Sequence, residues 1–405
     1  MRIPMNLNGV LAIMLAVPVS IQAAEWSAEP RISLRTGYND NIRLRAADHD
    51  SVWETALSPS VKFGVAKEHQ GLSGDAGFAI RRFTGGSGLE SSDILDREDY
   101  HLNTAAFHNT LRDSFKANLD YTLDSTLDTE LDETGNVIQD RATRERLSLG
   151  PSWTRTLTEL TSLELAYDYS NVEYSDDPGA NLVDNKYHVT SASLIRQLTP
   201  RMQATLAAGY SSYRPDTDFD SDTLSLQAGL SRNFSETLVA SFLVGQRQTT
   251  SDSQTFVFPI GLVNTEIETS SPVYSASISK TLETGSLGAS LSRSSSPGGN
   301  GELLDATRLA LTGDYKLSET FSTSLRIEYT ENETIVSRGG AVAPNQDKET
   351  FFRVTPRASW RWRREWELAG EYQYAENDDP TAGKATRNAV YATLTYRPVK
   401  ISVSR

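Results

Sequence analysis

The 405-residue sequence contains no cysteine, which excludes disulfide bonds and thiolate metal sites. It contains only five histidines, which are His49, His69, His101, His108 and His188. His101 and His108 fall in one predicted strand but, because their separation is odd, on opposite faces of it. The sequence therefore predicts neither a nucleophile–histidine pair nor a two-histidine metal site. It indicates a protein that is not an enzyme and that uses no cofactor or metal.

Long apolar runs are also missing beyond the N-terminus. The apolar run at residues 10–19 is about half of the roughly 20 residues that a membrane-spanning helix needs. It follows Arg2 and precedes the small residues Ala23 and Ala24. This order predicts a secretory signal peptide over residues 1–24, with residues 25–405 as the mature domain.

The mature chain is instead rich in residues that alternate between apolar and polar. Phe115, Leu119 and Tyr121 are separated by polar residues, and similar rows recur near 147–153, 163–169, 202–210, 321–329, 366–374 and 390–396. Since successive side chains of a strand point to opposite faces, each segment has one apolar and one polar face. The alternation holds for about nine to thirteen residues, against roughly five or six in an average strand. That length lets a tilted strand cross a bilayer.

The connections between these segments are of two kinds. Short ones recur at 157–160, 198–201, 234–237, 282–285 and 317–320, whereas 124–140, 175–184 and 214–222 are long and acidic. Short periplasmic turns and long outer loops are typical of outer-membrane barrels. The sequence therefore predicts an all-β fold, a closed antiparallel transmembrane β-barrel in the outer membrane of a Gram-negative cell.

Eighteen strands are predicted. Their spans are 31–38, 52–65, 71–83, 98–109, 112–124, 143–156, 160–174, 186–198, 201–213, 221–234, 237–249, 269–281, 285–294, 303–316, 320–331, 349–363, 365–376 and 385–397. Segments 98–109, 186–198 and 269–281 alternate poorly, so sixteen strands remain the alternative. Either number is even, as such barrels require.

A short motif near the mature N-terminus carries a family resemblance. Residues 30–42 read PRISLRTGYNDNI, and Leu57-Ser58-Pro59 opens the next strand. A strand ending in Gly-Tyr-Asx-Asp-Asn before a Leu-Ser-Pro strand resembles the outer-membrane β-barrel porin family associated with capsule and exopolysaccharide loci. The resemblance implies a passive channel that serves polysaccharide secretion. It also implies three partners: outer-membrane lipid, the barrel assembly machinery and periplasmic polysaccharide-export components. No nucleic-acid partner is expected.

The C-terminus departs from that family pattern. Such barrels usually end on an aromatic residue of the last strand, and Tyr396 fits this place, but residues 397–405 follow it. Either this tail extends into the periplasm or the last strand is misplaced.

The polar strand faces place ten basic and nine acidic residues in the barrel interior. The pore-lining candidates are Arg35, Arg326, Arg353, Arg357, Arg361, Glu328, Glu367 and Glu371. The arginines could guide an anionic solute or polymer. For most of these residues we favour a lattice of ion pairs that stiffens the barrel, because pairing lowers the cost of burying charge.

The hairpin around Arg364 yields a specific register. If the turn centres on this residue, Arg357 lies opposite Glu371 and Arg361 opposite Glu367. The same register sets Trp362 opposite Trp366. Arg353 then lacks an obvious partner on the strand that follows the turn, and it is the arginine of this row most expected to meet a passing anion.

Three functions remain open. The first is a channel for passage or secretion of polysaccharide or another polar solute. The second is a general diffusion porin, which requires an inward constriction loop that the sequence does not reveal. The third is a structural or adhesive barrel with acidic loops. Residues 216–222 place carboxylates at alternate positions but lack the glycine and final glutamate of a calcium loop, which favours a solvated acidic loop.

Overall fold

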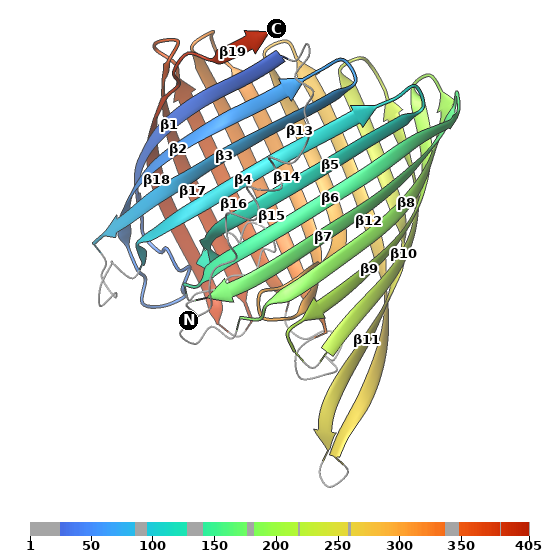
Figure 1. The fold of residues 1–405 in the computed structure, drawn as a ribbon. Coiled ribbons are helices and arrows are strands. Elements are labelled where there is room, and N and C mark those ends of the chain that lie inside the picture. Colours follow the sequence, from blue (N-terminus) through green and yellow to red (C-terminus); the bar gives the residue numbers. More distant parts are fainter. Residues whose placement is uncertain are drawn as a thin grey trace.

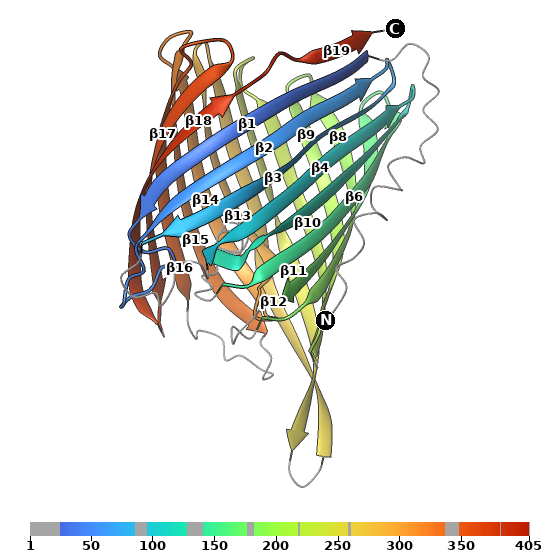
Figure 2. The ribbon, with the colours of Figure 1, turned by 60° about the vertical axis from the view of Figure 1, so that its left-hand side comes forward.

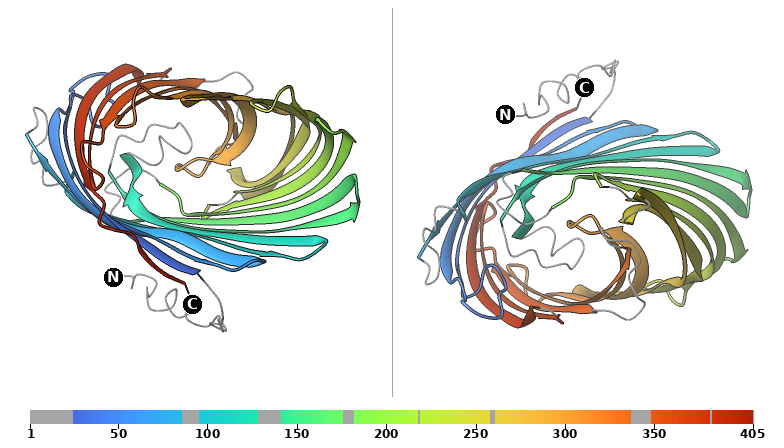
Figure 3. Two further views of the ribbon diagram at one scale, coloured as in Figure 1. Left: turned by 90° about the horizontal axis from the view of Figure 1, so that it is seen from above. Right: turned by 90° about the horizontal axis from the view of Figure 1, so that it is seen from below.

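The computed structural model describes residues 25–85, 95–127, 141–175, 182–217, 219–257, 261–336, 348–380 and 382–404. In this part of the chain the strands form one antiparallel sheet that closes on itself, because β1 pairs with both β2 and β18 (Figure 1). Seen from either end the barrel has an oval outline (Figure 3). The predicted signal peptide at residues 1–24 and most of the 124–140 loop lie outside the described residues.

Eighteen long strands make the wall, and a short nineteenth follows them. They are β1 Glu25–Asn39, β2 Val52–Ala66, β3 Gln70–Thr84, β4 Arg97–Asn109, β5 Asp113–Ser125, β6 Thr143–Thr158, β7 Thr161–Ser175, β8 Asn185–Thr199, β9 Met202–Pro215, β10 Phe219–Asn233, β11 Leu238–Val257, β12 Gly261–Leu282, β13 Gly285–Pro297, β14 Leu303–Lys316, β15 Phe321–Val336, β16 Glu349–Trp360, β17 Trp366–Asp379, β18 Gly383–Tyr396 and β19 Ile401–Ser404. The predicted eighteen-strand barrel is confirmed, and the sixteen-strand alternative is wrong.

The apolar side chains of the strands lie on the outer surface of the wall. Leu34 on β1, Leu149 on β6, Leu224 on β10, Leu311 on β14 and Leu368 on β17 are all exposed on the outer surface. Apolar residues exposed around a whole circumference are stable only against lipid, so this surface is the membrane-facing belt. No helix in the described part of the chain is long and apolar enough to cross a membrane.

The two ends of the barrel differ. The five short connections expected from the sequence all lie at one end, the upper end in Figure 1. The longer connections lie at the other end, where β11 and β12 extend as a hairpin well beyond the rim (Figures 1 and 2). Among the eighteen strands, these two differ most from their predicted bounds, which are 237–249 and 269–281. Their outer halves are rich in Ser, Thr and Gln and lack the apolar row that lipid contact imposes.

The C-terminal tail joins the wall. β19 pairs with the start of β1, with Ile401 opposite Ala28 and Ser404 opposite Glu25. Tyr396 on β18 pairs with Ile32, so the last strand was placed correctly. Both sequence-based expectations for the tail are wrong. The β1 residues that precede Ile32 extend past the end of β18, and the tail pairs with the edge that they would otherwise leave free.

Buried side chains gather inside the barrel, near the end with the longer connections. Three apolar clusters form there: Ile42, Val52, Phe83, Leu95 and Leu127; Leu44, Phe351, Ala375 and Ala385; and Tyr213, Phe219 and Leu303. Several of these residues belong to connections, not to strands. The connections therefore fold inward and pack on the inner wall.

Candidate functional site

The eight predicted pore-lining residues lie on one part of the inner wall, formed by β15, β16 and β17 together with the start of the sheet at β1. The turn after β16 adds Arg361 to them. On these strands the outward positions are taken by exposed apolar residues such as Leu325, Trp360 and Leu368, and the charged residues occupy the opposite parity. The eight residues are five arginines and three glutamates, but Glu349 on β16, Asp379 on β17 and Glu29 on β1 occupy the same inner parity, so this sector holds charges of both signs.

The predicted register of the β16–β17 hairpin is confirmed. Arg357 pairs with Glu371 across the two strands, and their side chains approach to 3.4 Å. Arg361 lies 3.6 Å from Glu367. On the outer face the rings of Trp362 and Trp366 stack with their centroids 6.2 Å apart.

The expectation for Arg353 is wrong. Its Nε donates to Glu328 of the neighbouring strand β15 at 2.8 Å, and its side chain is only 12 % exposed. The sequence argument considered β17 alone and overlooked the strand on the other side of β16. Arg326, which lies 3.9 Å from Glu328 and is 62 % exposed, is the most exposed arginine of this group.

Arg35 and Glu371 connect the first and last parts of the chain. The Arg35 guanidinium lies 3.4 Å from Glu371 on β17 and stacks 3.7 Å over the ring of Tyr391 on β18. Tyr391 covers Gly37, where a Cβ atom would fall 2.2 Å from its ring. Glycine is therefore required at this position for β1 to close against β18.

The Gly-Tyr-Asn-Asp-Asn motif that carries the family resemblance has a structural role here. The Asn41 side chain donates to the backbone oxygens of Arg45 at 2.8 Å and Thr386 at 3.0 Å. The Asp40 carboxylate accepts hydrogen bonds from the backbone and side chain of Asn388 at 2.7 and 2.9 Å. The motif thus fixes the β1–β2 connection to β18.

A hairpin formed by the ends of β13 and β14, with the connection at 298–302, turns into the barrel interior. Both end views show its tip inside the wall (Figure 3). The Val183 amide donates to the Gly299 oxygen at 2.9 Å, and Val183 packs against Gly301, which has a φ of +76°. This hairpin is the inward constriction that the sequence did not reveal.

Buried ion pairs hold the inward hairpin to the wall. Asp305 of β14 lies 2.5 Å from Arg247 of β11 and 3.0 Å from Arg293 of β13. Arg247 and Asp305 are 2 % and 4 % exposed, respectively. Arg293 also contacts Glu333 at 2.9 Å, and Glu333 is paired with Lys348. The hydrogen bonds of Lys348 to the two carboxylates of β15 raise the pKa of its ammonium group.

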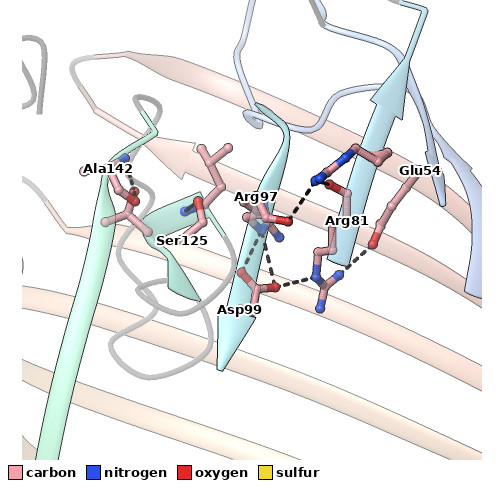
Figure 4. A network of polar contacts seen from close by, with 9 residues as sticks. Glu54, Arg81, Arg97, Asp99, Ser125 and Ala142 are labelled. Atoms are coloured by element: carbon pink, nitrogen blue, oxygen red, sulfur yellow. Dashed lines mark hydrogen bonds and ion pairs between the residues drawn. The ribbon is translucent and has the colours of Figure 1, made fainter. Parts of the chain in front are cut away.

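A second network crosses β2, β3 and β4. Arg81 contacts Glu54 at 2.6 Å and Asp99 at 2.5 Å, and Arg97 reaches the same aspartate at 3.2 Å (Figure 4). Beside it, the Ala142 amide donates to the Thr126 hydroxyl at 3.0 Å, which ties the two stems of the β5–β6 connection together. The network stabilises the inward fold of this part of the mouth.

The sequence analysis missed Arg247, Arg293 and Asp305 as a group. The sequence does contain a signal for two of them. Arg293 lies on the same strand face as Leu291, and Asp305 on the same face as Leu309, where alternation predicts apolar residues. A charge at such a position is costly against lipid, and here it marks where the strands leave the wall.

The described residues contain no cluster of three or more potential metal ligands. In the 216–222 segment, Asp220 and Asp222 are paired with Arg214 at 3.6 and 2.9 Å. Both carboxylates are therefore engaged by a cation of the protein itself. Residues 219–222 belong to β10, so the predicted long loop at 214–222 is wrong over this part, because pairing with β9 and β11 continues there. Asp218 lies outside the described residues.

No protein-family model matches the sequence, and no curated protein matches it. Among solved structures, the chain is similar to Pseudomonas aeruginosa OccK3 (OpdO), with 12 % identity over 93 % of this chain and 96 % of that one and a TM-score of 0.42. It is similar to P. aeruginosa OpdK, in a structure with vanillate, with 12 % identity, coverage of 93 % and 99 %, and a TM-score of 0.45. Acinetobacter baumannii OccAB3 gives 11 % identity, coverage of 93 % and 99 %, and a TM-score of 0.45.

Proposed function

We propose that this outer-membrane barrel is a channel for small polar solutes and that it favours anionic ones. The observation that supports the proposal is the guanidinium group of Arg326 on the inner face of β15, whose side chain is 62 % exposed. A cationic side chain in a confined polar passage attracts anions because the surrounding low-dielectric wall weakens screening.

Most of the neighbouring charge is neutralised within the wall. Arg353 is satisfied by Glu328, and Glu371 is shared by Arg35 and Arg357. The ion-pair lattice that we favoured from the sequence therefore accounts for the greater number of these residues. Selectivity in this proposal depends on the few exposed cations, not on the whole row.

The inward hairpin favours small solutes over unrestricted diffusion. It is held by buried ion pairs and by the Val183 contact, so it narrows the interior. The family resemblance offers polysaccharide secretion as a second candidate. The motif that carries it, Gly37 to Asn41, is engaged in holding β1 to β18, which lends no support to a role in sugar binding.

Ion selectivity in planar bilayers tests the proposal. The reversal potential in a salt gradient gives the anion-to-cation permeability ratio of the wild type and of Arg326→Gln. A charge-neutral control is the double variant Glu376→Gln/Lys384→Gln, which removes an ion pair from the outer face of β17 and β18 and leaves the net charge unchanged. We expect the ratio to exceed one in the wild type, to fall in the first variant and to change little in the second.

A cation-selective wild-type channel would contradict the anionic preference. Liposome swelling with a series of oligosaccharides separates the two candidates. Uptake that stops at mono- or disaccharides supports a small-solute channel, whereas uptake that continues along the series supports passage of polysaccharide.

A further inference from the structure

The short connections at one end of the barrel differ sharply in charge. Those after β6, β10, β12 and β14 each contain one glutamate and no basic residue: Glu159, Glu236, Glu283 and Glu319. The connection after β16, at 361–365, contains three arginines against Glu365. The connection after β18, at 397–400, contains Arg397 and Lys400 and no acidic residue.

These two basic connections are neighbours in space. The Arg397 amide donates to the backbone oxygen of Glu365 at 2.7 Å, and Trp366 pairs with Tyr396 where the two strands begin and end. Five cationic side chains are therefore concentrated in one sector of the rim, which we call the basic sector: Arg361, Arg363, Arg364, Arg397 and Lys400.

Three of the five are engaged by carboxylates. Arg361 and Arg397 approach Glu367 to 3.6 and 3.0 Å, and Lys400 lies 3.0 Å from Glu29. Arg363 and Arg364 are exposed, and no ion pair joins them to a carboxylate in the described part of the chain. Two guanidinium groups at this rim are thus available for an external anion.

An aromatic surface lies directly beside these arginines on the outer face. Trp360, Trp362, Trp366 and Tyr396 form a continuous row, with successive ring centroids 5.7, 6.2 and 4.7 Å apart. Trp360 and Trp362 are exposed. Tryptophan and tyrosine occupy the level of the lipid headgroups in membrane proteins, where an apolar ring meets a polar layer.

We propose that the basic sector binds the headgroup of an anionic phospholipid in the adjoining leaflet. The aromatic row packs against the upper acyl chains and the glycerol region, and Arg363 and Arg364 donate to the phosphate. Guanidinium matches phosphate oxygens in bidentate geometry and is less strongly hydrated than ammonium, which suits a partly desolvated site. The glutamates of the connections after β6, β10, β12 and β14 disfavour the same lipid there, and the connections after β2, β4 and β8 each contain a single lysine or arginine and no tryptophan.

The inference concerns the outer surface and does not depend on what the channel conducts. It is tested with the full mature barrel in phosphatidylcholine vesicles that contain a small fraction of brominated phosphatidylglycerol. Bromine quenches nearby tryptophans, so quenching beyond that produced by brominated phosphatidylcholine at the same fraction measures enrichment at the aromatic row. The variant is Arg363→Gln/Arg364→Gln. The control is Arg201→Gln, which removes an exposed arginine from the β8–β9 connection, where no tryptophan lies.

We expect excess quenching in the wild type and in the control. In the double variant the apparent affinity should fall about thirtyfold, since each of the two arginines near a charged lipid surface contributes on the order of 1 kcal/mol. Arg363→Lys/Arg364→Lys should retain part of the affinity. Equal quenching by the two brominated lipids in the wild type, or an equal loss in the control, would overturn the proposal. If the double glutamine variant fails to fold, Arg364→Gln alone decides between these outcomes.

Discussion

The sector β15–β18 and the hairpin of β13 and β14 are adjacent in the sheet, but they differ in where their charged side chains lie and in which strands those side chains join. In the first, every strand stays in the wall, and the ion pairs Arg353–Glu328 and Arg357–Glu371 join neighbouring strands on the inner face. In the second, the strand ends leave the wall. Asp305 lies on the face of β14 that carries the apolar side chains, and it contacts Arg247 on the inner face of β11.

The difference shows what strand alternation measures. Alternation indicates on which face of its own sheet a side chain lies. One face borders the lumen and the other borders lipid only while the strand remains in the barrel wall. Once the hairpin turns inward, its former outer face contacts the inner surface of β11, three strands away in the sheet. The charges there become buried contacts between non-neighbouring strands, and we expect each to influence stability more than a pair within the wall.

The largest effect should therefore follow from breaking the inward hairpin. Asp305→Ala removes the shared partner of Arg247 and Arg293; Arg293 retains Glu333, but the buried guanidinium of Arg247 loses its carboxylate partner. We expect the free energy of unfolding to fall by about 3–5 kcal/mol, as for other buried pairs that lose one member. Urea unfolding in detergent, followed by tryptophan fluorescence, gives this value, and a larger single-channel conductance should accompany it.

Asp314→Ala on the same strand is the matched control for this prediction. Asp314 is exposed, and its carboxylate accepts a long hydrogen bond of 3.5 Å from the Ser286 hydroxyl. If the two variants lose equal stability, the hairpin is not held by its buried charges.

The closure of β1 on β18 should give the next largest effect. Gly37→Ala places a methyl group within 2.2 Å of the Tyr391 ring, and overpacking of this kind costs about 1–3 kcal/mol. Gly370→Ala on β17 meets no atom within 4 Å and should be nearly neutral. Thermal unfolding read from heat-dependent gel mobility compares them. Adding Tyr391→Ala should recover only part of the loss at Gly37, because the methyl group would also lie 2.4 Å from the Val390 backbone oxygen.

Within the regular wall, a single ion pair should contribute little. A double-mutant cycle of Arg357→Gln and Glu371→Gln is expected to give a coupling of about 0.2–1 kcal/mol, as for other cross-strand charge pairs. The same unfolding assay measures it. A coupling as large as the effect of Asp305→Ala would remove the distinction between wall and hairpin.

The smallest expected effect is a dependence on pH at the tip of the inward hairpin. Burial raises the pKa of Glu302, which is bonded only to the Thr334 hydroxyl at 3.3 Å. A carboxyl group with a raised pKa in the native state binds protons more strongly there. It therefore favours the inward conformation at low pH and loses this contribution as pH rises through the raised value.

Single-channel conductance should accordingly decrease slightly as pH falls from neutral toward the ordinary range of a glutamate. Glu302→Gln should abolish the change and keep the low-pH conductance throughout. A conductance that responds to pH equally in this variant would assign the dependence to other groups.

The sequence alone determined the class of this protein and much of one wall. Alternation over bilayer-length segments follows directly from lipid on one side and polar surroundings on the other, so strand number and turn positions could be predicted. The β16–β17 register was predictable for the same reason, since Trp362, Trp366, Arg357 and Glu371 are close in sequence and share one turn.

Only the tertiary structure decided which charges meet across the barrel. The partner of Arg353 lies on the preceding strand, Arg35 reaches Glu371 over a distance of 336 residues in sequence, and β19 completes the edge of β1. The inward turn of β13 and β14 likewise depends on Arg247 and Val183, which belong to other hairpins. Local alternation contains no information about such contacts, because they arise from the closure of the sheet and the space that closure leaves inside.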